Sequence, residues 1–253
     1  MMRNKRITVF LVVFVGLCLV FLAVFSKKRA PAPEYKEISG WKEDFDFAPG
    51  KNRKGIPEGW RLNTKPGTPP SVFSVVKDDK SGLSFLEMKA DKSSASLVRW
   101  VKNVDLTKTP VLRWRWRVLV LPEGADGREK AKDDQAIGIY VGDGTLLNSK
   151  CVSYRWDTET PKGDEGNCAY AGGTFKVKWY TLRNKQDAPS GEWIIDERNF
   201  AKDFKEAWGA YPRKIYLGIS CNSQYTDSEA VAELDWIEFV SAEGEPRAEE
   251  GKK

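Results

Sequence analysis

Hydrophobic and polar residues alternate along the middle of this chain in the pattern of β-strands that bury one face. The clearest segment is residues 112–118 (LRWRWRV), in which every second residue is apolar. Because successive side chains of a strand point to opposite faces, the alternation predicts that Trp114 and Trp116 lie in a core and that the arginines between them face away. Nine further segments, short and rich in β-branched or aromatic residues, predict strands at 71–76, 83–88, 95–101, 136–141, 151–156, 175–182, 193–197, 215–221 and 230–239.

One segment has the spacing of an amphipathic helix instead. Phe200, Phe204 and Trp208 recur four residues apart. Asn199 is placed to cap the start of this helix, and Gly209 is placed to end it. About ten strands with one short helix predict an all-β jelly roll or β-sandwich, because a parallel α/β sheet would need a helix between most strands.

The N-terminal part of the chain has a different pattern, with a run of 19 almost entirely apolar residues at 7–25. As a helix this run would extend about 28 Å, close to the hydrocarbon thickness of a bilayer. Basic residues flank it on both sides, so the charge rule gives no orientation, but a short leader before a long domain is typical of a signal anchor or signal peptide. We favour an uncleaved anchor, since basic residues directly after the run are a poor context for cleavage.

This arrangement predicts four segments along the chain. Residues 1–29 form the membrane segment with its basic flanks, 30–40 a linker, 41–241 the β-sandwich domain and 242–253 a disordered tail. We therefore expect a single-pass inner-membrane protein whose domain lies in the periplasm, or a secreted protein if the apolar run is cleaved.

Composition narrows the chemistry that the domain can perform. The chain has no histidine, which excludes His-based catalytic triads and zinc sites that need an imidazole. Its net charge of +5 does not describe the domain, because six basic and no acidic residues fall in the first 29 positions. The other residues carry 35 basic and 36 acidic side chains, a balance that argues against binding of nucleic acid.

Three cysteines follow the apolar run, and no CxxC pair is present to indicate a zinc ribbon or a thioredoxin-like site. We expect Cys151 and Cys168, which are separated by 16 residues, to be the pair that forms a disulfide. Closing that loop would stabilise the domain by roughly 3 kcal/mol on the chain-entropy model. The alternative is that all of them are buried thiols that pack as small apolar residues.

Carboxylates are the remaining candidates for acid–base or cation chemistry. Asp133 and Asp134 follow a polar loop and precede the strand predicted at 136–141. Three interpretations stay open: a structural loop whose carboxylates cap turns or pair with basic residues, a calcium site built from oxygen ligands, and a pair of catalytic acids as in glycosidases. No catalytic residue is assigned, and a structural calcium ion is the one cofactor that we consider.

The arginines of the alternating strand, Arg113, Arg115 and Arg117, also have two interpretations. Guanidinium groups about 7 Å apart on one face would bind carboxylate, sulfate or phosphate groups of a ligand, which would make this the functional face. As an alternative, they form a charge ladder with acidic residues on a neighbouring strand. Glu233 and Asp235 share one face of their strand and are spaced for such a ladder.

Tryptophan is abundant, with 10 residues in the chain, and part of this abundance belongs to the core. Trp114, Trp116 and Trp236 fall on the apolar side of their strands and are expected there. The remaining tryptophans are less constrained by the pattern. Aromatic rings stack on the apolar faces of sugars, so a Trp-rich sandwich outside the cytoplasm is typical of a carbohydrate-binding module.

The order of several motifs resembles a bacterial family, that of the domain of unknown function 3047. These motifs are residues 112–118, 121–128 (LPEGADGR), 132–134 (KDD), 153–156 (SYRW), 193–200 (WIIDERNF), 203–204, 208–209 and 215–222. The resemblance covers roughly residues 45–240 and implies an exported, single-domain β-sandwich similar to galactose-binding jelly rolls. Because the family has no established activity, the resemblance implies no catalytic residues. Arg155 and Trp156, in the SYRW motif, join the three arginines above as candidate ligand-binding residues.

The sequence departs from the family pattern after the strand at 215–221. The family has an Asp-rich stretch at this place, whereas residues 221–224 of this chain read CNSQ and Asp227 comes later. A cation or ligand site that uses those aspartates is therefore in doubt here.

These observations predict a membrane-anchored β-sandwich of the cell envelope that binds a ligand without catalysis. A glycan of the envelope or extracellular matrix is the expected ligand. One rival is a glycan hydrolase or lyase that uses carboxylates on the concave sheet, and another is an envelope domain that binds a second protein. The expected partners are thus the membrane, through residues 7–25, and a glycan, but not nucleic acid.

Overall fold

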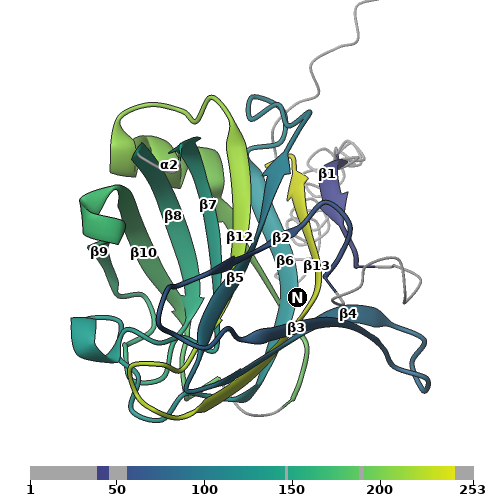
Figure 1. The fold of residues 1–253 in the computed structure, drawn as a ribbon. Helices are drawn as coiled ribbons and strands as arrows, with labels where there is room; N and C mark the ends of the chain where they lie inside the picture. Colours follow the sequence, from purple (N-terminus) through teal and green to yellow (C-terminus); the bar gives the residue numbers. More distant parts are fainter. Residues whose placement is uncertain (1–38, 46–55, 146–147, 188–190, 243–253) are drawn as a thin grey trace, which may run out of the picture. The chain divides into compact units, whose positions relative to one another are not determined.

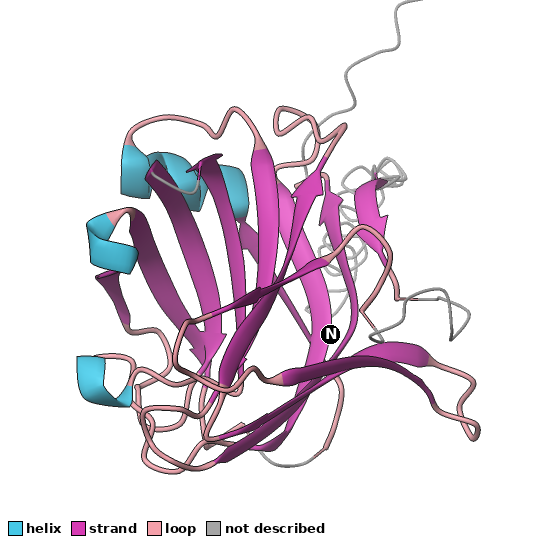
Figure 2. Cartoon of the chain, viewed as in Figure 1, coloured by secondary structure: helices cyan, strands magenta, loops and turns pink. Residues whose placement is uncertain are grey.

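The computed structural model describes residues 39–45, 56–145, 148–187 and 191–242, which form two β-sheets around a shared core (Figures 1 and 2). This arrangement confirms the predicted all-β sandwich. The apolar run at 7–25 lies outside the described residues. Among the residues that are described, no helix is long and apolar enough to cross a membrane.

The strands divide between the two sheets without regard to their order in the sequence. Sheet I contains β1 (Ser39–Glu43), β3 (Val72–Lys77), β4 (Ser84–Asp91), β6 (Val111–Val120), β11 (Ile194–Asn199) and β13 (Glu229–Val240). Sheet II contains β2 (Arg61–Thr64), β5 (Ser94–Val101), β7 (Ile137–Thr145), β8 (Asn148–Trp156), β9 (Glu165–Tyr170), β10 (Phe175–Arg183) and β12 (Ile215–Asn222).

The order of strands in each sheet places late segments of the chain beside early ones. Sheet I has the order β11, β6, β13, β4, β3, with β1 paired to β13. Sheet II has the order β2, β5, β12, β7, β8, β10, β9. Neighbouring strands are antiparallel apart from β8 and β10, which are parallel.

All ten strands predicted from the sequence are present within a few residues of their expected bounds. The prediction missed β1, β2 and β9, of which β2 and β9 form the two edges of sheet II. The sequences of these two edge strands, RLNT and EGNCAY, contain few apolar residues, and most of their side chains are partly or fully exposed. An edge strand with so little buried surface has no hydrophobic alternation by which to recognise it.

The helix α2 (Phe200–Trp208) confirms the predicted element and both of its ends. Asn199 Oδ1 accepts a hydrogen bond from the backbone N–H of Lys202 at 3.0 Å, which caps the first turn. Gly209 ends the helix with a φ of 79°, and its N–H donates to the carbonyl of Lys205 at 2.8 Å. Two short 3₁₀ helices, η1 (Lys130–Lys132) and η2 (Ala171–Gly173), lie in loops beside sheet II.

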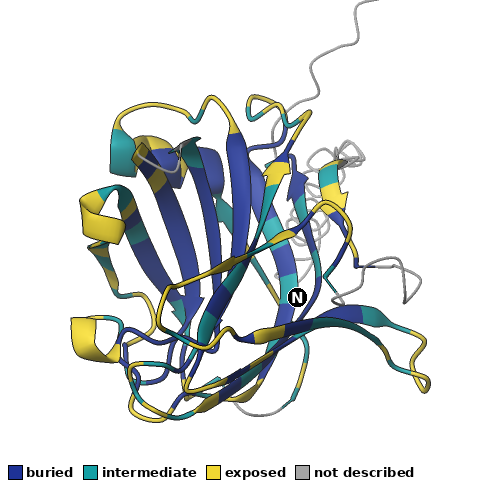
Figure 3. Ribbon diagram, in the orientation of Figure 1, coloured by how far each residue is buried: buried dark blue, intermediate teal, exposed yellow. Residues whose placement is uncertain are grey.

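The core is centred on Trp114 and Trp116, which are both 0% exposed, as the alternation predicted. Trp114 stacks on Tyr154 with 5.2 Å between ring centroids, and Trp116 meets the edge of Trp156 at 5.5 Å. Since Tyr154 and Trp156 belong to β8, these contacts join sheet I to sheet II. Figure 3 shows buried residues along the central strands of both sheets.

The third tryptophan expected in the core, Trp236, is only partly buried, so that prediction was wrong. The pairing of β13 with β6 shifts register between Leu234 and Trp236, which makes Asp235 an extra residue in β13. A β-bulge of this kind changes which residues point inward beyond it. Ile237 and Phe239 therefore face the core in place of Trp236.

Candidate functional site

A groove of about 2950 Å³ lies beside sheet II. Strands β2, β5, β7, β8, β9, β10 and β12 contribute lining residues, and α2 and several loops contribute its rim. The alternation along the strands decides which side chains line it. In β5, Leu97 is fully buried in the core, whereas Val98 and Trp100, which point to the opposite face of the strand, line the groove.

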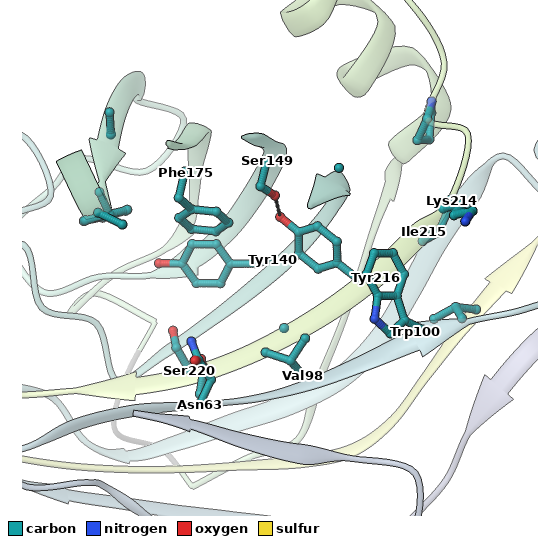
Figure 4. A pocket seen from close by; sticks show the side chains of 18 of the residues that line it. Asn63, Val98, Trp100, Tyr140, Ser149, Phe175, Lys214, Ile215, Tyr216 and Ser220 are labelled. Atoms are coloured by element: carbon teal, nitrogen blue, oxygen red, sulfur yellow. Dashed lines mark hydrogen bonds between the residues drawn. The ribbon is translucent and has the colours of Figure 1, made fainter. Parts of the chain in front are cut away.

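Trp100 and Tyr216 form an aromatic platform on the floor of this groove (Figure 4). They are cross-strand neighbours on β5 and β12, and their ring centroids are 5.7 Å apart at an interplanar angle of 78°. The Tyr216 side chain is buried, and its hydroxyl forms a hydrogen bond of 2.6 Å with Ser149 Oγ. Trp100 is 48% exposed. The indole is thus supported from the side while much of its surface remains open to a ligand.

Two glycines of β7 make room for aromatic rings over the sheet. A Cβ atom at Gly142 would lie 2.5 Å from the Tyr216 hydroxyl oxygen, and one at Gly138 would lie 2.9 Å from the Tyr140 ring. Any side chain at these positions would displace the rings. The Tyr140 ring in turn lies 6.2 Å from that of Phe175, which continues the aromatic surface toward β10.

Hydrogen-bonding side chains lie beside the aromatic platform. Asn63, Ser96 and Ser220 form one row across β2, β5 and β12 and line the groove. Next to this row, Ser94 Oγ donates to Asn222 Oδ1 at 2.9 Å. Hydroxyl and amide groups both donate and accept hydrogen bonds. A ligand in the groove therefore meets an apolar ring surface and neutral polar groups side by side.

A buried ionic network underlies the groove between β8, β9 and the loop before β7. Arg155 is 0% exposed, and its Nη1 donates to Asp133 Oδ1 at 2.9 Å. Tyr170 donates its hydroxyl to the other oxygen of Asp133 and accepts from Arg155 Nη2 at 3.2 Å. The Arg155 guanidinium also lies 5.3 Å from the ring centroid of Trp179. Arg155, a candidate ligand-binding residue, thus holds the floor together from beneath and does not itself line the groove.

Asp157 extends this polar region away from the groove. Its carboxylate accepts from Thr160 Oγ1 at 2.7 Å, from the Thr158 N–H at 2.8 Å and from the Gly127 N–H at 3.1 Å. Burial nevertheless raises the pKa of Asp157 to about 6, because loss of water outweighs these hydrogen bonds and the nearby Arg155 charge.

The adjacent carboxylates Asp133 and Asp134 serve different networks. Whereas Asp133 pairs with Arg155, Asp134 Oδ2 accepts from the N–H groups of Tyr225 and Thr226, both at 2.8 Å. Burial raises the pKa of Asp134. Among the residues that the structure describes, no group of three or more Cys, Asp or Glu side chains is arranged to hold a metal ion. The two aspartates thus serve separate hydrogen-bond networks, and the calcium site considered from the sequence stays a prediction.

The predicted arginine stripe lies on the outer face of sheet I, apart from the groove. Arg115 Nη1 pairs with Asp235 at 2.9 Å, and Arg117 pairs with Glu233. Arg113 pairs with Glu197 of β11 at 2.8 Å. These ion pairs form the charge ladder that was considered as the alternative for this face.

The indole of Trp156, the last candidate ligand residue, is also inaccessible to a ligand. It is 1% exposed, and its Nε1 donates to the carbonyl of Asn184 at 3.1 Å. It follows Arg155 in β8 and points into the core between the sheets, where it contacts Trp116. Trp156 is thus a core residue.

The expected disulfide between Cys151 and Cys168 is not formed, and both are free thiols. Val177 of β10 is paired with Cys151 of β8 on one side and with Cys168 of β9 on the other. Two strand spacings, about 9.6 Å, exceed the Cα separation that a disulfide can span. The insertion of β10 between the two strands was not visible in the sequence.

The platform residues were missed by the sequence analysis, although one signal was present. In the strand predicted at 95–101, Leu97 and Val101 mark the buried face, so Trp100 shares the opposite face with Ser96. A tryptophan on the polar side of a half-buried strand is a candidate contact residue. Tyr216 gave no comparable signal, because its strand is buried along nearly its whole length.

Comparison with protein families confirms the resemblance drawn from the motifs. The family described as "Protein of unknown function (DUF3047)" matches residues 58–238, which is most of the chain. The match spans the strands from β2 to β13, and so contains the groove. No curated protein matches the chain.

Solved structures with a similar arrangement include two carbohydrate-related domains. The family 11 carbohydrate-binding module of the Clostridium thermocellum cellulase Lic26A-Cel5E is 9% identical, with a TM-score of 0.40, and the match covers 81% of this chain and 96% of the module. The xyloglucanase domain of NopAA from Sinorhizobium fredii, in complex with cellobiose, is 10% identical, with a TM-score of 0.45, covering 82% and 100%. At this level of similarity, the ligand of each remains a property of that protein.

Proposed function

We propose that this chain, which belongs to the DUF3047 family of proteins of unknown function, binds a glycan in the groove of sheet II. The observation that carries the proposal is the half-exposed Trp100 on the groove floor, backed by Tyr216. A sugar ring has an apolar face that stacks on an indole, and hydroxyl groups at its edge that need hydrogen-bond partners. Asn63, Ser96 and Ser220 supply such partners on neighbouring strands.

The size of the groove supports an extended ligand. Its volume of about 2950 Å³ exceeds the range of pockets that enclose a small molecule, roughly 300–1,000 Å³. A chain of several sugar units would occupy it, with one ring on the platform and others along the strands. The tyrosine and phenylalanine rings between β7 and β10 provide further apolar surface for them.

We propose binding without catalysis, as the sequence suggested. Three acidic residues line the groove, namely Asp105, Asp133 and Glu206. Asp133 is paired with Arg155, Asp105 accepts from Thr107 Oγ1 at 2.6 Å, and Glu206 lies 3.9 Å from Lys202. A glycosidase needs two carboxyl groups placed on either side of the scissile bond, one of them protonated. Carboxylates engaged with basic or hydroxyl groups are poorly suited to that task.

The test is direct titration of the full-length chain with oligosaccharides, after an array of envelope and plant-type glycans has identified a binder. We expect Trp100→Ala to weaken binding about tenfold or more, while Trp236→Ala, which removes a partly buried indole from the outer face of sheet I, leaves it unchanged. No binding to any glycan, or equal binding by the Trp100 variant, would contradict the proposal. If the protein instead releases new reducing ends from the bound glycan, it hydrolyses that glycan, and the proposal of binding without catalysis is wrong.

We further propose that residues 7–25 anchor the domain to the inner membrane, with the domain in the periplasm. The proposal rests on the length and apolarity of this run and on the domain that follows it. A fusion of alkaline phosphatase after Val240 should be active, and a cytoplasmic reporter at the same position should be silent. The opposite pattern would refute it.

A further inference from the structure

The lining of the groove carries an excess of positive charge that the rest of the domain does not share. Eight lysine or arginine residues line it, against three acidic residues. Over residues 30–253 the chain has 35 basic and 36 acidic residues, so the excess is local. A concave surface lined by one sign of charge concentrates ligands of the opposite sign.

Several of these basic side chains have partners that leave the excess in place. Lys205 lies 4.9 Å from the Tyr211 ring centroid, and Lys65 lies 4.8 Å from that of Tyr225. Contacts with aromatic rings hold a lysine in position but do not cancel its charge. Arg213 lies 3.9 Å from Asp143 and is 92% exposed, where such a pair is weak.

Lys102 and Lys214 are placed next to the aromatic platform. Val101 and Ile215 are the last registered pair of the antiparallel β5–β12 ladder. Lys102 directly follows Val101, Lys214 directly precedes Ile215, and both line the groove. Figure 4 shows Lys214 near Trp100 and Tyr216. Both lysines are exposed, and neither forms an ion pair with another described residue.

Two lysines at matching ends of adjacent strands repel one another unless an anion lies between them. Such an arrangement has no evident role in stability, because it weakens the sheet end that it occupies. It would, however, bind an anionic group of a ligand whose neighbouring ring rests on Trp100. The observed geometry thus combines a stacking surface with an unneutralised pair of cations.

We infer that the glycan bound in the groove is acidic, and that an anionic group on a sugar stacked on Trp100 binds between Lys102 and Lys214. This inference rests on the proposed function of the groove. Carboxylates of uronic acids supply the required chemistry, as each lies on the sugar ring itself. Nucleic acid is less suitable, because residues 30–253 carry 35 basic and 36 acidic side chains and so have no net positive charge.

The experiment compares matched acidic and neutral ligands on the full-length chain. The probes are hexasaccharides of galacturonate and mannuronate and hyaluronan oligomers, each beside its carboxyl-reduced form. We expect the acidic form to bind about tenfold more tightly, with an affinity that falls as salt concentration rises. We expect the double variant Lys102→Ala, Lys214→Ala to lose about tenfold in affinity for the acidic form and little for the neutral form.

The matched control is the double variant Lys77→Ala, Lys80→Ala, which removes the same charge from exposed positions at the end of β3 and in the turn that follows it. It should bind the acidic probes like the parent protein. Equal loss in both double variants would show a general charge effect and overturn the assigned position of the anion. Equal affinity of the parent for the acidic and carboxyl-reduced probes would overturn the inference, but not the proposed function.

The two proposals fail in different ways. If neither acidic nor neutral glycans bind, and Trp100→Ala changes nothing, glycan binding itself is wrong. Tighter binding of a single-stranded oligonucleotide or of phosphatidylglycerol vesicles than of any oligosaccharide, lost in the Lys102, Lys214 variant, would assign the cations to another class of ligand. Circular dichroism of each variant verifies that the fold is retained, which is expected since all four lysines are exposed.

Discussion

Arg155 and Asp133 form an ion pair inside the domain, with 2.9 Å between Nη1 and Oδ1 and side-chain exposures of 0% and 5%. Arg155 belongs to strand β8 of sheet II, and Asp133 belongs to the loop that precedes β7. Burying two charges costs free energy that their pairing offsets only when the geometry and further hydrogen bonds are good. Tyr170 and Gln135 complete this pair by hydrogen-bonding to the same carboxylate.

Removal of either partner alone should therefore be costly. We expect Arg155→Met and Asp133→Leu each to lower the free energy of unfolding by about 3–5 kcal/mol, because each leaves an uncompensated buried charge. The double variant should be more stable than either single variant, since no charge remains buried. Urea unfolding of the four proteins measures this, and additive losses in the double variant would show that the two groups act independently.

The two core tryptophans differ in one respect that can be measured. Trp116 Nε1 donates to Asp196 Oδ2 at 2.8 Å, whereas Trp114 Nε1 is buried without a partner among the described residues. Replacement of either residue by Ala should cost about 3–5 kcal/mol of stability. Replacement by Phe should cost about 1 kcal/mol more at Trp116 than at Trp114, because only Trp116 loses a hydrogen bond. Thermal or urea unfolding of the two Phe variants provides the comparison, and equal losses would contradict the role of Asp196.

The arginine ladder of sheet I should influence stability but not ligand binding. Arg115 is 30% exposed in its pair with Asp235, so we expect Arg115→Ala to lower the free energy of unfolding by only about 1 kcal/mol. Because the residue lies on sheet I, the affinity for any glycan bound in the groove should stay at the parent value. Unfolding and titration are measured on the same preparation. Unchanged stability together with lost ligand binding would return the functional role to this face.

Asp157 should make stability depend on pH in the mildly acidic range. Its pKa is raised from 3.8 to about 6 in the folded protein, so the folded state binds the proton more tightly than the unfolded state does. Stability is therefore greatest below pH 4 for this group and falls as pH rises through 6, by about 3 kcal/mol in all.

The variant Asp157→Asn isolates this contribution from those of other groups. The difference in free energy of unfolding, parent minus variant, should decrease between pH 4 and pH 7 and stay level above that. A difference that is constant with pH would mean that Asp157 titrates normally. Asp79→Asn serves as the control, because this aspartate is exposed at the turn between β3 and β4.

Local features of the fold were predictable, since they depend on residues that are close in the sequence. The alternation at 112–118 placed Trp114 and Trp116 correctly, and Asn199 and Gly209 marked the ends of α2. The bulge at Asp235 was not predictable, because an inserted residue leaves no trace in the pattern of one strand.

The location of the groove depends on contacts between distant segments. Trp100 and Tyr216 are brought together only by the pairing of β5 with β12, more than a hundred residues later. The same kind of pairing, of β10 with both β8 and β9, separated the cysteines that were expected to form a bridge. The arginine stripe was considered as a functional face because its charges were visible in the sequence, as were its partners Glu233 and Asp235. The groove was not visible, because it depends on pairing between distant strands.

The position of β13 has a consequence for biosynthesis. This strand follows the other described strands in the sequence, yet it lies between β6 and β4 in the interior of sheet I. During translation, β4 and β6 therefore lack the strand that joins them until residues 229–240 have left the ribosome. A chain truncated before this point would have unpaired inner edges on β4 and β6, which are templates for aggregation. Sheet I can therefore be completed only after the chain has been synthesised through β13.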